Sequence, residues 1–178
     1  MKTITNRLPA RIEIEFVFGF LVFAVFTWSI RGFLLEIPAF LLYYRLPDIF
    51  GIFSYMMAFA LLESVLIMGI ILLLTIIFPT RWLCQGFAYK STAILLIFGG
   101  AMIYLQKILT FQLPTIKELL LVTAIPLLSL IVLLFLLSTN QRLRTIIDAT
   151  LERFRIFSYI YIPLGLIGFV VAIFRNIF

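Results

Sequence analysis

Long uncharged and mostly apolar runs recur along this chain, separated by short polar segments. A membrane-spanning helix needs about 20 mostly apolar residues, because about 30 Å of hydrocarbon is crossed at about 1.5 Å per residue. The runs are long enough for such helices and lack the two-residue alternation of strands. They cover residues 16–30, 49–62, 64–80, 91–106, 119–141 and 156–174.

The second and third runs form one stretch that a single acid, Glu63, interrupts. The pattern therefore predicts an all-α, polytopic membrane bundle in a single domain over residues 1–178. The five predicted spans cover approximately residues 16–35, 51–78, 88–109, 117–138 and 156–175.

The segment after the first span is too apolar for an ordinary loop. Residues 36–48 contain Glu36 and two prolines, Pro38 and Pro47, which interrupt a helix because proline lacks the N–H donor. We interpret this segment as interfacial or re-entrant. The alternative is a tilted extension of the first helix that ends in an interfacial turn.

The segment before the last span, residues 139–155, has the pattern of an amphipathic helix. Apolar side chains recur at helical spacing, and acids lie on the opposite face. Arginines flank the apolar stripe on both edges, which is typical of a helix lying in the plane of a membrane interface. The flanking arginines are Arg142, Arg144, Arg153 and Arg155.

Composition excludes several classes of function. Hydrophobic residues make up 64% of the chain and charged residues 12%, whereas a soluble domain has about a quarter charged residues. No histidine is present, which excludes histidine-based metal sites and Ser-His or Cys-His nucleophiles. No nucleotide-binding or nucleophile motif occurs. We therefore expect no enzymatic activity, cofactor or metal.

The net charge of +6 fits a membrane topology better than nucleic-acid binding. If five spans divide the chain, the N-terminus and every second loop carry nine basic residues and the other segments carry five. The positive-inside rule then places the N-terminus in the cytoplasm and the C-terminus outside the cell membrane. Trp28 and Trp82 lie near the predicted outer and inner boundaries, where indole rings favour the headgroup level. Basic loops also favour anionic lipid headgroups as partners.

Glu63 is the strongest candidate for a functional residue. An ionisable group within a span generally faces other helices or water, and it often marks an ion or substrate pathway. Its helical neighbours provide no polar partner, so a contact is expected from another helix or another chain. The intrachain candidates are Arg31, Lys107 and Gln106. A neutral Glu63 that donates one hydrogen bond is the alternative.

Four glycines are candidates for close helix packing, because small residues let helix backbones approach one another. They are Gly99, Gly100, Gly165 and Gly168. A notch for a ligand is the alternative interpretation.

The leading hypothesis is a non-catalytic subunit, anchor or scaffold of a larger membrane assembly, with other membrane chains or further copies of itself as partners. A small transporter or channel with Glu63 in its pathway is the alternative. The spans carry few other polar groups, whereas a pathway for polar solutes needs more lining. An intramembrane enzyme is the weakest hypothesis, because one carboxyl group makes a poor acid–base apparatus.

Overall fold

The computed structural model describes residues 9–77, 86–111 and 115–177, and within them the chain is helical without a strand. The predicted all-α class is confirmed. Most of the helices consist of the apolar runs identified above, with polar residues near their ends. The five helices are α1 (Arg11–Tyr43), α2 (Leu46–Ile77), α3 (Phe87–Phe111), α4 (Ile116–Thr139) and α5 (Gln141–Ile177).

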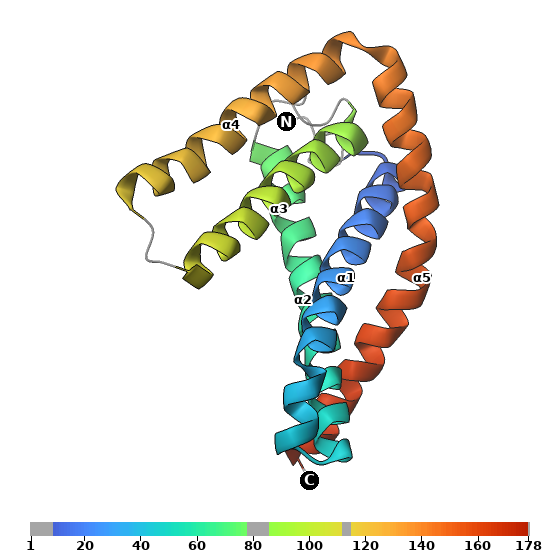
Figure 1. Ribbon diagram of the computed structural model, residues 1–178. Coiled ribbons are helices and arrows are strands. Elements are labelled where there is room, and N and C mark those ends of the chain that lie inside the picture. The colour runs from blue at the N-terminus through green and yellow to red at the C-terminus, as the bar shows by residue number, and fades with distance from the viewer. Residues whose placement is uncertain (1–8, 78–85, 112–114, 178) are drawn as a thin grey trace.

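The helices α1, α2 and α5 pack side by side, and α3 with α4 forms a pair that leans away from them (Figure 1). Within the three-helix bundle, α1 and α5 run in the same direction and α2 runs in the opposite one. The core lies between these three helices and the start of α3. Its fully or nearly buried side chains are Val17, Leu21, Val22, Phe26, Met57, Ala60, Met68, Ile71, Phe87, Ala88 and Leu151.

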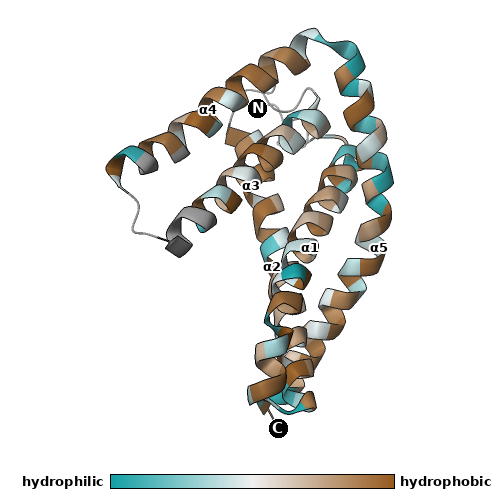
Figure 2. Cartoon of the chain, in the orientation of Figure 1, coloured by the Kyte–Doolittle hydropathy of each residue, from teal (hydrophilic) through white to brown (hydrophobic). Residues whose placement is uncertain are grey.

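Much of the remaining surface is apolar, and hydrophilic residues gather mainly on the first half of α5 and at the chain turns (Figure 2). Helices α1, α2 and α5 and the Phe87–Gln106 part of α3 are long and apolar enough to cross a membrane. The chain is therefore a membrane protein with several transmembrane helices. The described apolar part of α4, Thr123–Thr139, is shorter, so its crossing stays a prediction.

Of the two interpretations of residues 36–48, the extension of the first helix followed by a turn agrees with the structure, and the interfacial or re-entrant segment does not. Helix α1 continues through Pro38 to Tyr43, and α2 begins at Leu46 after a short turn. A proline removes only one donor from the helical ladder, and packing can hold the remaining turns in place. Phe33 provides such packing, because its ring lies 5.7 Å from that of Phe40 and 5.1 Å from that of Phe53 on α2.

The prediction of a separate in-plane helix at residues 139–155 is wrong. The segment is helical from Gln141, but it continues without a break into the last span as α5. The second half of its apolar stripe packs against α1, whereas Ile146 in the first half is 61% exposed. Leu151 is buried in the core, and the ring of Phe154 meets that of Phe20 at 5.3 Å. An apolar stripe of this kind can pack on a protein helix or on a membrane surface, and here α1 covers its second half.

Candidate functional site

Two ion pairs define the two ends of the apolar part of α5. At one end, Arg155 lies 2.9 Å from Glu15 of α1. At the other end, Arg175 contacts Asp48 of α2 and the carbonyl oxygen of Pro47. The arginines are 20 residues apart with no charge between them, which corresponds to about 30 Å of helix and matches the hydrocarbon thickness of a bilayer.

Glu63 lies near the middle of this interval. Gly165 is halfway between Arg155 and Arg175, and a Cβ atom at Gly165 would lie 2.7 Å from the Cβ of Leu61 on α2. Leu61 therefore marks the midpoint level on α2. Glu63 follows it by two residues, which is about 3 Å along the helix axis.

The Glu63 side chain faces away from the bundle. The buried side of α2 carries Met57, Ala60, Ser64 and Met68, whereas Glu63 lies on the exposed side. Its neighbours on the exposed side are large and apolar. They are Phe59, Leu62, Leu66 and Ile70, each at least 50% exposed.

Among the described residues, the structure shows no intrachain partner for Glu63, and a contact from a partner chain stays a prediction. No hydrogen bond or ion pair joins it to Arg31 or Gln106, and the side chain of Lys107 lies outside the described residues. The Arg31 guanidinium instead lies 5.3 Å from the centre of the Trp28 ring on the same helix. The small residues Ala60 and Ser64, not the acid, face the neighbouring helices.

The position of Glu63 is energetically unfavourable for a charged group in a lone chain. On insertion scales, a carboxylate at the bilayer centre costs about 3 kcal/mol. No cation or donor within the described part of the chain offsets this cost. An exposed, unpartnered acid at mid-membrane depth is therefore the feature most in need of a functional explanation.

The two glycine pairs have different surroundings. Gly165 and Gly168 lie against α2, and a Cβ at Gly168 would come within 2.6 Å of the Ser54 carbonyl oxygen. At Gly99 and Gly100 no heavy atom of the described chain lies within 4 Å of such a Cβ, so no helix of this chain packs closely there and their packing role stays a prediction. Gly100 instead lines an open apolar groove between α3 and α4 of about 410 Å³.

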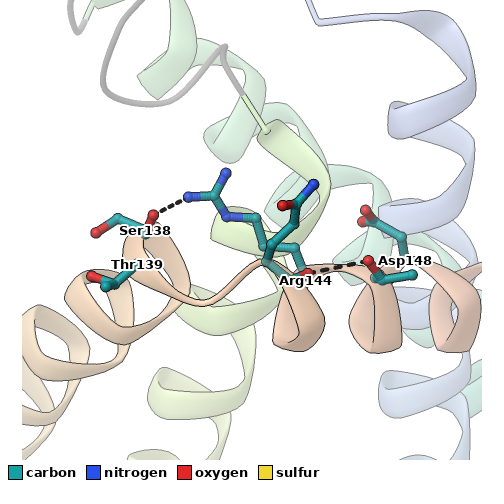
Figure 3. A pocket seen from close by; sticks show the side chains of 6 residues that line it. Ser138, Thr139, Arg144 and Asp148 are labelled. Atoms are coloured by element: carbon teal, nitrogen blue, oxygen red, sulfur yellow. Dashed lines mark hydrogen bonds between the residues drawn. The ribbon is translucent and has the colours of Figure 1, made fainter.

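The four arginines near the start of α5, which the sequence places beside the apolar stripe, differ in their contacts. Arg144 donates to the carbonyl oxygen of Ser138 (Figure 3) and to that of Leu137, which satisfies acceptors left free at the end of α4. It also lies 5.1 Å from the centre of the Tyr89 ring on α3. Arg142 and Arg153 are exposed, and Arg155 is paired with Glu15. Trp82 lies outside the described residues.

An open polar pocket lies at the turn between α4 and α5 (Figure 3). Its volume is about 530 Å³, and it was not anticipated from the sequence. The lining residues are Ser138, Thr139, Gln141, Arg144, Thr145 and Asp148. Arg144 is already engaged by the end of α4, so the pocket presents no free cation to a ligand.

Burial raises the pKa of Glu13, and the nearby Asp148 carboxylate raises it further, while a hydrogen bond to the Ala10 backbone acts in the opposite direction. Burial also raises the pKa of Asp148. The folded protein therefore binds protons at these carboxyls more readily than the unfolded chain does. The Glu13 and Asp148 carboxyls lie near the starts of α1 and α5. They are therefore outside the apolar interval between Arg155 and Arg175.

The stability should consequently depend on pH. As pH rises through the raised pKa values, above the ordinary values of 4.5 and 3.8, the free energy of unfolding is expected to fall. Thermal unfolding in detergent at pH 5 and pH 7 measures this. Glu13→Gln should flatten the dependence, whereas the matched exposed control Glu152→Gln should leave it unchanged. An equal effect of both variants would contradict the assignment.

Sequence reasoning did not identify the acids that pair with the α5 arginines. Glu15 and Asp48 each lie directly beside an uncharged run. That position at the end of a predicted span could have identified them as partners for the arginines at the ends of the last span. Among the described residues, no group of three His, Cys, Asp or Glu side chains is arranged to hold a metal ion. No protein-family model, curated protein or solved structure matches the chain.

Proposed function

We propose that the protein is a non-catalytic subunit or anchor of a cell-membrane assembly, and that the exposed face of α2 docks a transmembrane helix of another chain. This face is defined by Phe59, Leu62, Glu63, Leu66 and Ile70. The observation that carries the proposal is the exposure of Glu63 at mid-membrane depth without a partner in the described chain.

A docked helix would offset the cost of placing Glu63 in the membrane. A donor on the partner would meet the carboxylate in surroundings from which the apolar neighbours exclude water. Polar contacts between membrane helices are worth about 0.6–2 kcal/mol, and van der Waals packing of the flanking side chains adds to this. One acid on an apolar face thus fixes how far the partner helix is shifted along α2 and also adds to the affinity between the two helices.

A transporter with its pathway inside one chain is less well supported. The core between α1, α2 and α5 is filled with apolar side chains. The buried hydroxyls of Ser64 and Thr75 donate to carbonyl oxygens of their own helix, at 2.7 Å and 2.6 Å. Such hydroxyls provide little lining for a polar solute.

The orientation in the membrane is part of the same proposal. The nine-to-five division of basic residues supports a cytoplasmic location for the ends of α1 and α5 that meet at Glu15 and Arg155. The exposed Arg142 and Arg153 lie toward this end and are suited to anionic lipid headgroups.

Substitution of Glu63 tests the docking role. In mild detergent, the wild-type protein is expected to have a mass above that of one 20.5 kDa chain, and Glu63→Leu should lower it toward that value. Glu63→Gln should retain more of the assembly, because its amide still accepts a hydrogen bond. Light scattering after size-exclusion chromatography measures these masses.

The matched control is Val65→Leu, which places the same side chain at an exposed position on α2. It should leave the mass unchanged. If Glu63→Leu has the same mass as the wild-type assembly, the docking role of this face is wrong.

A further inference from the structure

A second charged side chain lies inside the apolar interval, on the outside of α1. Arg31 is exposed, and no carboxylate of the described chain pairs with it. Its contact is the ring of Trp28, one turn away. Within the apolar interval, α1 therefore presents the base Arg31 on its exposed side and α2 presents the acid Glu63 on its exposed side.

Arg31 and Glu63 lie at nearby levels along the bundle axis. Gly19 of α1 lies at the level of Arg155, because a Cβ at Gly19 would be 2.9 Å from the Arg155 Cα atom. Arg31 follows Gly19 by 12 residues, or about 18 Å, which places it about 3 Å past the midpoint toward the C-terminal end of the bundle. Glu63 lies about 3 Å on the opposite side of the midpoint. The two Cα atoms are therefore separated by about 6 Å along the bundle axis.

The directions of the side chains shorten this separation. In a helix, side chains tilt toward the N-terminus. Because α1 and α2 run in opposite directions, Arg31 tilts toward the level of Glu63 and Glu63 tilts toward the level of Arg31. The long arginine stem covers much of the remaining distance along apolar surface.

We propose that Arg31 of one copy pairs with Glu63 of a neighbouring parallel copy. This inference rests on the proposed docking role of the α2 face, and it names a second copy of this chain as the occupant. Each copy contributes one donor and one acceptor, so repetition of the contact around a closed oligomer leaves neither Arg31 nor Glu63 unpaired.

The surface around Arg31 is suited to helix contact. Trp28 and Leu35 are exposed one turn before and after it, which extends an apolar stripe along α1. At Gly32 nothing lies within 4 Å of a built Cβ, so another helix can approach closely there. This stripe faces the exposed stripe of α2 in the proposed contact.

Charge exchange between copies tests the pairing. Arg31→Glu and Glu63→Arg should each weaken self-association in detergent about tenfold, because each places like charges together. Co-expressed with different tags, the two variants should associate with each other, since both of their interchain pairs are then of opposite charge. Arg45→Glu, at the exposed turn between α1 and α2, is the matched control and should associate like the wild type.

Cross-linking tests the contact with both charges retained, in case Glu63→Arg fails to insert. With Cys84→Ser in every copy, a Thr27→Cys copy and a Leu62→Cys copy should be joined by a short bis-maleimide in membranes. Leu166→Cys, at the same depth but on α5, should give no such product with Thr27→Cys.

The two proposals fail in different ways. If the wild-type chain does not self-associate and no Thr27–Leu62 product forms, the self-pairing is wrong. If a complex of the wild type with another protein is then lost in the Glu63→Leu variant, the docking role is still supported. If neither self-association nor a complex with another protein responds to Glu63→Leu, both proposals are wrong.

Discussion

Replacement of Gly168 by leucine is expected to separate α2 from α5 and to unfold the three-helix bundle. A Cβ at this position would lie 2.6 Å from the Ser54 carbonyl oxygen and 3.2 Å from the Ala58 amide nitrogen. Both obstacles are backbone atoms of one helix, so they cannot move aside as a side chain can. Overpacking a core costs about 1–3 kcal/mol, and we expect at least the upper end of this range.

Thermal unfolding in detergent measures this effect, together with the yield of folded protein. Gly99→Leu is the matched control, because the same side chain enters open space there. The control should unfold near the wild-type temperature, whereas Gly168→Leu should unfold far below it or fail to accumulate. Similar unfolding temperatures for the two variants would show that α2 and α5 need no close approach at Gly168.

A reporter fused after Phe178 is expected to lie outside the cell, and one inserted within residues 78–85 is expected to lie in the cytoplasm. The start of α1 and the end of α5 lie at opposite ends of the bundle (Figure 1). The excess of basic residues assigns the cytoplasm to the end where α1 starts. Each reporter is expected in one compartment only, so each fusion gives either a cytoplasmic or an external signal.

Compartment-specific enzyme or fluorescence reporters measure this location, with a fusion before Met1 as the cytoplasmic control. Two cytoplasmic readings, after Phe178 and within residues 78–85, would contradict an odd number of crossings. Helix α4 would then be the first to reconsider, since its described apolar part is the shortest.

The two sides of α2 differ, so the proposed docking face is separate from the side that stabilises the fold. The side with small residues, including Ala60 and Ser64, meets α1 and α5, where close approach is possible. The other side carries large apolar residues and Glu63. Substitutions on the first side should therefore impair folding, whereas Glu63 substitutions should change association and spare the fold.

The all-α class and the approximate positions of the long apolar helices could be predicted from the sequence, because bilayer thickness sets the length of an apolar run. The continuity of residues 36–43 with α1 and of residues 141–155 with α5 could not. Glu63 stood out in the sequence for the same reason, since an acid within such a run is unfavourable in any arrangement. Neither conclusion requires knowledge of which helices are neighbours.

The direction in which each residue faces was decided by the tertiary structure. A helix that is apolar on all sides has no polar face to indicate its rotation, so the sequence could not show that Glu63 points outward. Gly99 and Gly168 likewise look equivalent in sequence, yet only Gly168 has a helix against it. The stripe before residue 156 fits a membrane surface or a protein helix equally well, and the presence of α1 beside it decided the outcome.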